Sequence, residues 1–398
     1  MWVYYVLIPL FSAFIGWITN VVAIKMTFFP LEFVGLKPYL GWQGIIPAKA
    51  PKMARVAVDT ITAKALDIDV VISRVDPHAM AEEVRPRFQP LLSDILTEVM
   101  EETVPTLWEA MPQRVKDEIV ARLQAEMPSL IADVIAEIKR NIGEFLDIRK
   151  IFIERLVQNK ALLNKIFQQC GAAEFKFIER SGFHFGFLFG ILQMLVWMAF
   201  PAWWILPLAG FAVGYVTNWL AIKMIFEPLE PTKFGPITWQ GLFLRRQKEV
   251  SKEYSQLVAW EILNSERLLQ EIVQGPGKPR LEKIIQRHVA RAVDASLGLV
   301  KPVVQLAVGT QEYREARAQV SARIIADLPR LVRILHKYTD DVLDLQGTLY
   351  RRMIALPSFE FENFLRPVFK EDELKLILVG GALGLAIGAV QLLLFFSS

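Results

Sequence analysis

The 398-residue sequence predicts an all-α integral membrane protein formed by a tandem duplication, in which each unit carries a transmembrane helix, a helical soluble arm and a second transmembrane helix. Two observations lead to this prediction. Four stretches are apolar enough to cross a bilayer, which requires about 20 residues of helix. A motif near the start of the chain also returns 198 positions later. The composition agrees, because 53% of residues are hydrophobic while 22% are charged, as in a chain with separate apolar and charged segments.

The four apolar stretches set the predicted boundaries. The first lacks a basic leading region and a small-residue cleavage site, so we expect a retained membrane helix rather than a signal peptide. The predicted membrane helices are 1–26, 182–200, 202–226 and 374–396. The predicted helical arms are 27–178 and 227–370, and each begins with an interfacial segment, 27–50 or 227–245. The two repeats are 1–201 and 202–398.

The internal repeat is the strongest pattern in the sequence. Residues 16–32 read GWITNVVAIKMTFFPLE, and residues 214–230 read GYVTNWLAIKMIFEPLE. After a one-residue deletion, Trp42-Gln43-Gly44 returns as Trp239-Gln240-Gly241. The closing helices match at the same offset, each with three glycines and a glutamine at equal spacing. Self-similarity of this kind predicts two copies of one structural unit.

Small residues at every fourth position let membrane helices approach closely. Each predicted membrane helix carries one such stripe, and each stripe ends in a side-chain amide. The pattern predicts a glycine-zipper bundle of four helices with pseudo-twofold symmetry. The predicted packing residues are Gly16, Gly182, Gly186, Gly190 and Gln193 in the first repeat and Gly214, Gly380, Gly384, Gly388 and Gln391 in the second.

Topology follows from counting helices. Two helices per repeat return the chain to its starting side, so both arms lie on one face of the membrane. Basic residues such as Lys25 and Lys223 flank the helices on the arm side, whereas the opposite loop carries none. The positive-inside rule then predicts cytoplasmic arms.

Polar residues cluster at the arm-side end of each opening helix, and Pro30 and Pro228 are expected to end these helices. Two interpretations stay open. The Thr-Asn pairs form either a polar site for an ion, headgroup or substrate, or interhelical hydrogen bonds. The aromatic and basic residues that follow form either an interfacial segment or a headgroup-binding turn. The candidate binding residues are Thr19, Asn20, Lys25, Glu32, Trp42 and Lys49, and Thr217, Asn218, Lys223, Glu230, Trp239 and Arg245.

The arms are predicted to be helical throughout. Residues 113–126 and 129–142 each show the apolar stripe of an amphipathic helix. Pro105, Pro112 and Pro128 predict a string of short helices, and no strand alternation is found. Such helices either pack on one another or form a sheath for lipid.

Several function classes lose support. Cys170 is the single cysteine, so no intramolecular disulfide or cysteine metal cluster can form, and we expect a buried thiol. The four histidines lack metal-ligand spacing, and no catalytic or phosphate-binding motif is present. A net charge of +3 does not favour nucleic-acid binding. We therefore expect no enzyme activity, no cofactor and no metal.

The duplicated TNxxAIKMxFxPLE block, the WQGxxP stretch and the segment EFxFIxxSGxxFGFxxGxxQ at 174–193 resemble a known family. It is the domain of unknown function 445 family, which includes the YheB-like bacterial membrane proteins. The resemblance spans nearly the whole chain and implies a bacterial cytoplasmic (inner) membrane protein, with no established activity to carry over. In the second repeat, Pro47 and Lys49 become Leu244 and Arg246.

Three functions remain. The leading hypothesis is a non-enzymatic protein whose arms interact with membrane lipid, in lipid handling or envelope organisation. The first alternative is a small repeat-type transporter or channel that uses the Thr-Asn sites at the bundle axis. The second is a membrane scaffold that recruits a membrane-associated protein. A second copy of the chain is a further partner that the sequence leaves open.

Overall fold

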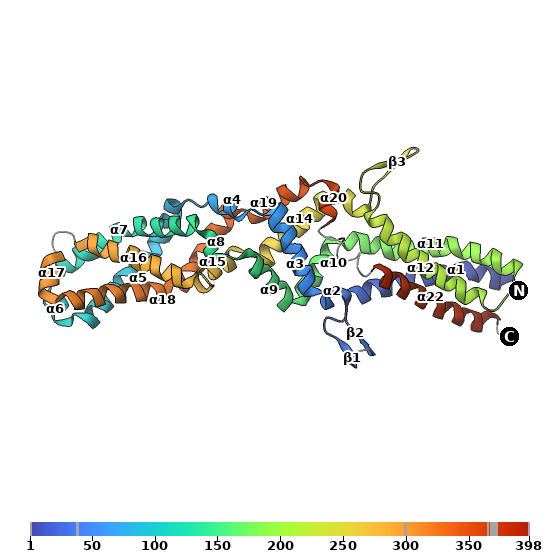
Figure 1. Ribbon diagram of the computed structural model, residues 1–398, viewed down its shortest axis with the longest axis horizontal. Coiled ribbons are helices and arrows are strands. Elements are labelled where there is room, and N and C mark those ends of the chain that lie inside the picture. The colour runs from blue at the N-terminus through green and yellow to red at the C-terminus, as the bar shows by residue number, and fades with distance from the viewer. Residues whose placement is uncertain (1, 37–39, 298–300, 364–365, 367–372, 397–398) are drawn as a thin grey trace. The chain divides into compact units, whose positions relative to one another are not determined.

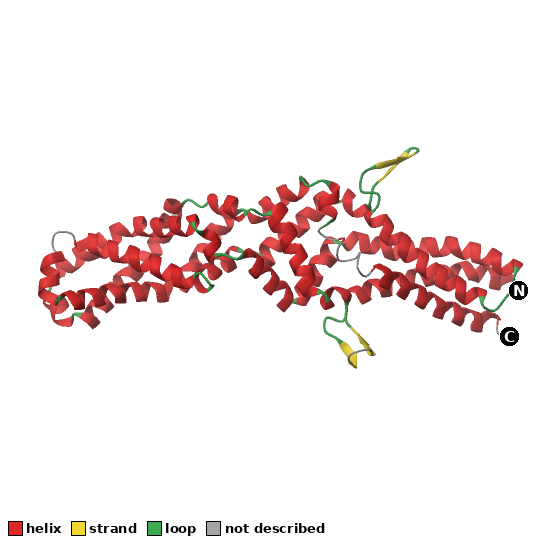
Figure 2. Cartoon of the chain, in the orientation of Figure 1, coloured by secondary structure: helices red, strands yellow, loops and turns green. Residues whose placement is uncertain are grey.

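The computed structural model describes residues 2–36, 40–297, 301–363, 366 and 373–396. The chain is almost entirely helical, which confirms the predicted all-α class (Figures 1 and 2). It divides into two compact units. Residues 1–65, 152–257 and 349–398 form the first, here called the membrane unit, and residues 66–151 and 258–348 form the second, here called the arm unit. Each arm of the sequence therefore contributes to both units.

Four helices of the membrane unit are long and apolar enough to cross a bilayer, as predicted. They are α1 (Trp2–Phe28), α11 (Ala172–Ala199), α12 (Ile205–Phe226) and α22 (Glu373–Phe396). Helices α1 and α12 each end two residues before the expected proline, and α11 begins ten residues before the predicted span at 182. The start of α1 and the end of α22 lie at the same end of this bundle (Figure 1).

The four helices pack as two close pairs. Helix α1 lies along α11, and α12 lies along α22. The pairs meet through α11 against α12, α1 against α22, and α1 against α12. Sequence periodicity is weak in these helices because both the packed and the lipid-facing sides are apolar. Small residues rather than hydrophobic alternation therefore mark the packed faces.

The rest of the membrane unit consists of short helices and two small hairpins. The hairpins are β1 (Val34–Leu36) with β2 (Leu40–Trp42), and β3 (Thr232–Phe234) with β4 (Ile237–Trp239), both antiparallel. They project from opposite sides of this unit (Figure 2). The expectation that the sequence contains no strands is wrong here, because three-residue strands are too short to show alternation. The remaining elements are α2 (Ile45–Ala48), α3 (Ala50–Thr60), the π-helical turn η1 (Ile61–Ala65), α9 (Ile148–Gln158), α10 (Lys160–Cys170), α13 (Leu242–Arg245), α14 (Gln247–Leu257), α19 (Leu345–Ile354) and α20 (Ser358–Glu362), of which α9 and α19 begin in the arm unit.

The arm unit is built on four long helices that come from both arms. They are α5 (Pro77–Thr103), α7 (Gln113–Arg140), α16 (Lys278–Leu297) and α18 (Thr310–Leu343). Shorter elements complete the unit: α4 (Ile68–Ser73), α6 (Pro105–Ala110), α8 (Ile142–Phe145), the π-helical turn η2 (Val258–Ile262), α15 (Ser265–Gln274) and α17 (Lys301–Val308). Asp67 and Asn264 accept backbone hydrogen bonds as the N-caps of α4 and α15.

The predicted string of short helices is only partly right. Pro105 and Pro112 do lie at the starts of α6 and α7, but Pro128 lies inside the 28-residue α7. Helices α5 and α18 likewise contain Pro86, Pro90 and Pro329. A proline removes one intrahelical hydrogen bond and bends the helix, yet tertiary packing on both sides of it can hold the helix together.

One hydrophobic core holds the two arms together. Its buried residues include Phe88, Leu92 and Met127 from the first arm, and Ile284 and Ile324 from the second. Each of these five side chains is at most 4% exposed. Burial of a leucine- or phenylalanine-sized side chain contributes about 1.5–3 kcal/mol. The two apolar stripes predicted from the sequence both lie on α7, and in this core they pack against helices of both arms.

Candidate functional site

Close backbone contact at glycine defines both helix pairs of the membrane unit. In the first pair, a Cβ atom on Gly16 or Gly182 would meet the other residue's backbone closer than 3.0 Å. Gly214 and Gly380 are related in the same way in the second pair. The other four predicted packing glycines, Gly186, Gly190, Gly384 and Gly388, also leave no room for a Cβ against the facing backbone. All eight glycines lie in the two contacts, and none of them can hold a larger side chain without separating the helices.

The predicted Thr-Asn pairs are buried and already bonded. Thr19 and Thr217 donate to carbonyl oxygens of their own helices, with distances of 2.8 Å to Ile15 O and Val213 O. The amide of Asn20 donates to Ile178 O at 2.5 Å, and that of Asn218 donates to Leu376 O at 3.0 Å. Both asparagines are at most 3% exposed. The side chains therefore join opening helix to closing helix, although the Oδ1 atom of each asparagine has no described partner.

The two predicted glutamines have different surroundings. Gln193 Oε1 accepts a hydrogen bond of 2.5 Å from the Ser12 hydroxyl. Gln391 is 1% exposed, and neither of its side-chain polar atoms has a hydrogen-bond partner among the described residues. Gly210 occupies the position that matches Ser12, so the second pair lacks the hydroxyl.

The repeated Trp-Gln-Gly motif closes the loop that follows each opening helix. Trp42 Nε1 donates to Met26 O at 3.2 Å, and Trp239 Nε1 donates to Glu227 O at 3.3 Å. The glutamines that follow donate to Leu31 O at 2.7 Å and to Leu229 O at 2.9 Å. The backbone N–H groups of Gly44 and Gly241 then bond Pro30 O and Pro228 O at 2.9 and 3.0 Å. These bonds explain why the motif recurs without requiring a ligand.

The charged candidates of the interfacial segments do not gather in one turn. Glu32 pairs with Lys160 at 2.8 Å, and Lys223 lies 3.6 Å from Glu227. Lys25, Glu230 and Arg245 are exposed, and Lys49 is half-buried at the start of α3. No described contact brings Lys25, Lys49, Lys223 and Arg245 together.

Sequence reasoning missed the ion pair of Arg246 with Glu174. Arg246 Nη1 lies 2.8 Å from both carboxylate oxygens of Glu174, which is 4% exposed. Burial acts against the charge on Arg246, but the hydrogen bonds from Glu174 and Glu249 outweigh it and raise the pKa of the guanidinium. The change from Lys49 to Arg246 between the repeats was the available signal, because the separate nitrogens of arginine can reach two carboxylates at once, here Glu174 through Nη1 and Glu249 through Nε.

Cys170 and Tyr254 are buried near this pair. Burial raises the pKa of the Cys170 thiol far above its usual range, and the carboxylates of Glu253 and Glu174 act in the same direction. A thiol held in its protonated form is a poor nucleophile and a poor metal ligand. Cys170 is therefore the inert buried cysteine that the sequence predicts.

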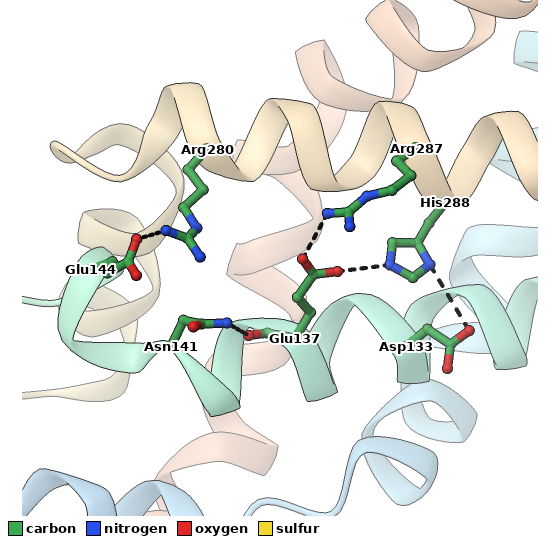
Figure 3. A network of polar contacts seen from close by, with 7 residues as sticks. All are labelled: Asp133, Glu137, Asn141, Glu144, Arg280, Arg287 and His288. Atoms are coloured by element: carbon green, nitrogen blue, oxygen red, sulfur yellow. Dashed lines mark hydrogen bonds and ion pairs between the residues drawn. The ribbon is translucent and has the colours of Figure 1, made fainter.

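A polar network connects the two arms on the surface of the arm unit (Figure 3). Glu137 of α7 accepts a hydrogen bond of 2.7 Å from Arg287 of α16, and its other oxygen lies 3.0 Å from His288 Nε2. The pair of Arg280 with Glu144 joins α16 to α8, the short helix that follows α7. The hydrogen bond with His288, followed by the contact with Arg287, lowers the pKa of Glu137. Among the described residues no group of three or more His, Cys, Asp and Glu side chains could hold a metal ion.

A cavity of about 190 Å³ lies inside the arm unit. Helices from both arms line it, and among the described lining residues two are polar, Lys139 and Thr339. Lys139 Nζ donates to Ser73 O at 2.8 Å and Val75 O at 2.7 Å, so its charge is held at the end of α4 while its methylene stem faces the cavity. Representative apolar lining residues are Val84, Phe88, Val134, Ile135, Ile272 and Ile324. The described lining of this cavity is therefore mainly apolar.

Comparison with known proteins finds relatives that are named membrane proteins. The chain is 34% identical over 148 residues to a UPF0754 membrane protein of Synechococcus sp. (strain JA-2-3B'a(2-13)), which covers 35% of this chain and 33% of that protein. It is 30% identical over 155 residues to a UPF0754 membrane protein of Thermosynechococcus vestitus, covering 36% and 34% of the two chains. A UPF0754 membrane protein of Staphylococcus epidermidis is 24% identical over 106 residues, covering 26% and 28%.

These matches span about a third of the length of the relatives. No protein-family model matches the chain, and no solved structure matches it. The matching relatives and the four candidate spans agree in indicating a membrane protein. The chain is homologous, over about a third of its length, to the bacterial UPF0754 membrane proteins, which confirms the resemblance to the domain of unknown function 445 family.

Proposed function

We propose that this chain is a non-enzymatic multi-pass membrane protein whose arm unit interacts with membrane lipid, in lipid handling or envelope organisation. The observation that carries the proposal is the apolar cavity of about 190 Å³ between helices of both arms. An apolar cavity of about 150 Å³ in another protein stays dry and binds benzene. By that measure this cavity admits a segment of an acyl chain.

The residue composition of the cavity lining supports an aliphatic ligand. Isoleucine, leucine and valine dominate the described lining. Its one charged member, Lys139, is bonded to two carbonyl oxygens. A well-packed core leaves few voids larger than a water molecule. A cavity of this size therefore calls for an occupant, and a lipid chain is the hydrocarbon available to a membrane protein.

The tandem duplication with pseudo-twofold symmetry is part of the proposal. Matched contacts in the two halves of the membrane unit support it. Asn20 and Asn218 donate to Ile178 O and Leu376 O, which both lie 158 residues later in the chain. Helix α11 packs on α12 as α1 packs on α22, which is the exchange that a twofold relation between the repeats requires. We propose the glycine stripes as zippers within each repeat.

The proposed location is the bacterial cytoplasmic membrane, with both arms in the cytoplasm. The distribution of lysine and arginine around the membrane helices supports this side. The transporter alternative has less support, because the Thr-Asn side chains are used in helix contacts and both asparagines are at most 3% exposed. For a scaffold or a self-associating chain, no specific observation favours a protein partner over lipid.

Lipid analysis of the full-length chain tests the proposal. Protein purified in mild detergent would be washed extensively, and the retained lipid would be quantified by mass spectrometry. Val134→Phe fills the cavity from α7, and Val115→Phe places the same side chain on a surface position of α7 that is 41% exposed. We expect the wild type and Val115→Phe to retain an acyl-chain lipid that a folded Val134→Phe chain loses. Equal retention in all three, or a lipid-free wild type, would refute a lipid in the cavity.

A further inference from the structure

A second cavity lies in the membrane unit, at the end of α12 from which the chain enters the second arm. Its volume is about 100 Å³, and its surface is mainly polar. Lining residues include Trp219, Lys223, Glu227, Arg366 and Glu373. Lys223 lies in the last turn of α12, and Glu373 is the first residue of α22. Because both helices are candidate spans, a cavity at these ends lies at the level of lipid headgroups.

Two cations face this cavity around the shared carboxylate of Glu227, and Arg366 also pairs through Nη1 with Glu362. Lys223 Nζ lies 3.6 Å from Glu227 Oε2, and Arg366 Nη2 lies 3.4 Å from Glu227 Oε1. Strong charge-assisted hydrogen bonds are shorter, at about 2.7–2.9 Å. Lysine has three donors and arginine five, so donors of both cations remain for a further oxygen ligand. Lys223 also lies 5.1 Å above the ring of Trp219, which holds the ammonium at the cavity wall.

Among the described lining residues the charges balance, and Arg366 is also paired with the buried carboxylate of Glu362 behind the lining. Glu227 and Glu373 oppose Lys223 and Arg366. An anion alone would meet two carboxylates, whereas a headgroup that carries both a phosphate and an amine finds a partner for each charge. A primary ammonium also has three donors for carboxylates, which a quaternary amine lacks.

We propose that Lys223 and Arg366 bind the phosphodiester of a zwitterionic phospholipid while Glu373 binds its primary amine. The inference rests on the proposed lipid interaction, but it concerns a different unit of the chain and a headgroup rather than an acyl chain. The ligand is a phosphatidylethanolamine-type lipid in the leaflet on the arm side.

The first repeat lacks this site. The positions that match Trp219, Glu227 and Glu373 are Val21, Phe29 and Phe175, and Gln168 matches Arg366. Only the lysine is kept, as Lys25, which is exposed. One headgroup site per chain is therefore expected, and Lys25→Ala is a control that removes the same charge at the matching position.

The test measures lipid binding to the full-length chain in detergent by native mass spectrometry. Phosphatidylethanolamine and phosphatidylglycerol with identical acyl chains are titrated separately. We expect one tight phosphatidylethanolamine at this site per wild-type chain, in addition to the lipid proposed for the arm-unit cavity. Removal of both cations in Lys223→Ala/Arg366→Ala should weaken it about tenfold, while Lys25→Ala should not change it. The charge-conserving Lys223→Arg chain should keep the binding, which separates loss of charge from loss of fold.

Two outcomes would overturn the assignment. If the double variant binds phosphatidylethanolamine as the wild type does, these cations are not the site. If phosphatidylglycerol binds equally well, or millimolar inorganic phosphate displaces the lipid, the site recognises an anion rather than a zwitterionic headgroup. The Val134→Phe chain should retain this binding. A lipid site in the arm-unit cavity can therefore be refuted without refuting the headgroup site.

Discussion

The hydroxyl of Ser12 donates a hydrogen bond of 2.5 Å to the side-chain oxygen of Gln193, inside the contact of α1 with α11. In the matching contact of α12 with α22, Gln391 has no hydroxyl partner among the described residues, because Gly210 stands at the position of Ser12. The two helix pairs therefore share their backbone packing but differ in how their buried amides are satisfied.

Replacing each glutamine by leucine should separate these two cases. A buried polar group without a partner costs about 1–3 kcal/mol, so Gln391→Leu should stabilise the chain. Gln193→Leu removes a hydrogen bond as well, and hydrogen bonds between membrane helices contribute about 0.6 kcal/mol on average. We expect Gln391→Leu to be the more stable variant by about 1 kcal/mol, measured by reversible unfolding in detergent micelles. Equal stabilities would show that Gln391 does find a partner.

Adding one methyl group to a packing glycine should force a helix pair apart. A Cβ on Gly384 would meet the backbone of Gly210 closer than 3.0 Å, and backbone cannot move aside as a side chain can. We expect Gly384→Ala to lower the unfolding free energy by about 1–3 kcal/mol, the usual cost of overpacking. Ala386→Val adds bulk to an exposed position of the same helix and should change it by less than about 0.5 kcal/mol. A similar effect of both variants would argue against the close contact.

The Arg246–Glu174 pair should control access to Cys170. Truncating one partner of a buried ion pair costs about 3–5 kcal/mol, because the other charge loses its partner. We expect Glu174→Ala to speed maleimide labelling of Cys170, the single cysteine and a buried one, by about a hundredfold or more. Glu249 also pairs with Arg246 but is 67% exposed, so Glu249→Ala should alter the labelling rate only slightly. Unchanged labelling in Glu174→Ala would show that the pair does not stabilise this region.

Acid should destabilise the arm unit through Glu137. Its pKa in the folded chain lies below the ordinary value of about 4.5, so its contribution is complete above that pH and is lost as pH falls through the folded pKa. We expect Glu137→Gln to unfold at a lower temperature than wild type at pH 7 and to converge with it as the pH falls below the folded pKa of Glu137. Glu118 lies on the same helix, is 62% exposed and pairs with Arg122, so Glu118→Gln is the matched control. A constant difference across the whole pH range would contradict this role.

Much of the fold could be predicted because its signals are local. These signals are an apolar stretch of about twenty residues, a proline after each opening helix, and an N-cap at Asp67 or Asn264, and each affects only the residues next to it. Pro128 shows the limit of such reasoning. Its local effect is to break a helix, but residues packed on both sides of it keep α7 continuous.

The candidate sites depend on residues far apart in the chain, and there the sequence was less informative. Arg246 and Glu174 are separated by 72 residues, and Arg366 and Glu227 by 139. The apolar cavity needs helices from both arms, so one arm alone does not form its wall. The Trp-Gln-Gly repeat was visible, but its role in closing a loop appears only once the hydrogen bonds are known.

The sequence by itself determined the number of candidate membrane helices, the stripes of small residues on them and the helical character of the arms. Each of these is a property of one continuous segment and can be recognised from that segment alone. The tertiary structure decided which faces meet. It joined the two arms in one core, used the Thr-Asn pairs in helix contacts and placed Lys223 beside Arg366 rather than Arg245. An apolar stripe is satisfied by any apolar partner, so its partner is fixed only when all helices pack at once.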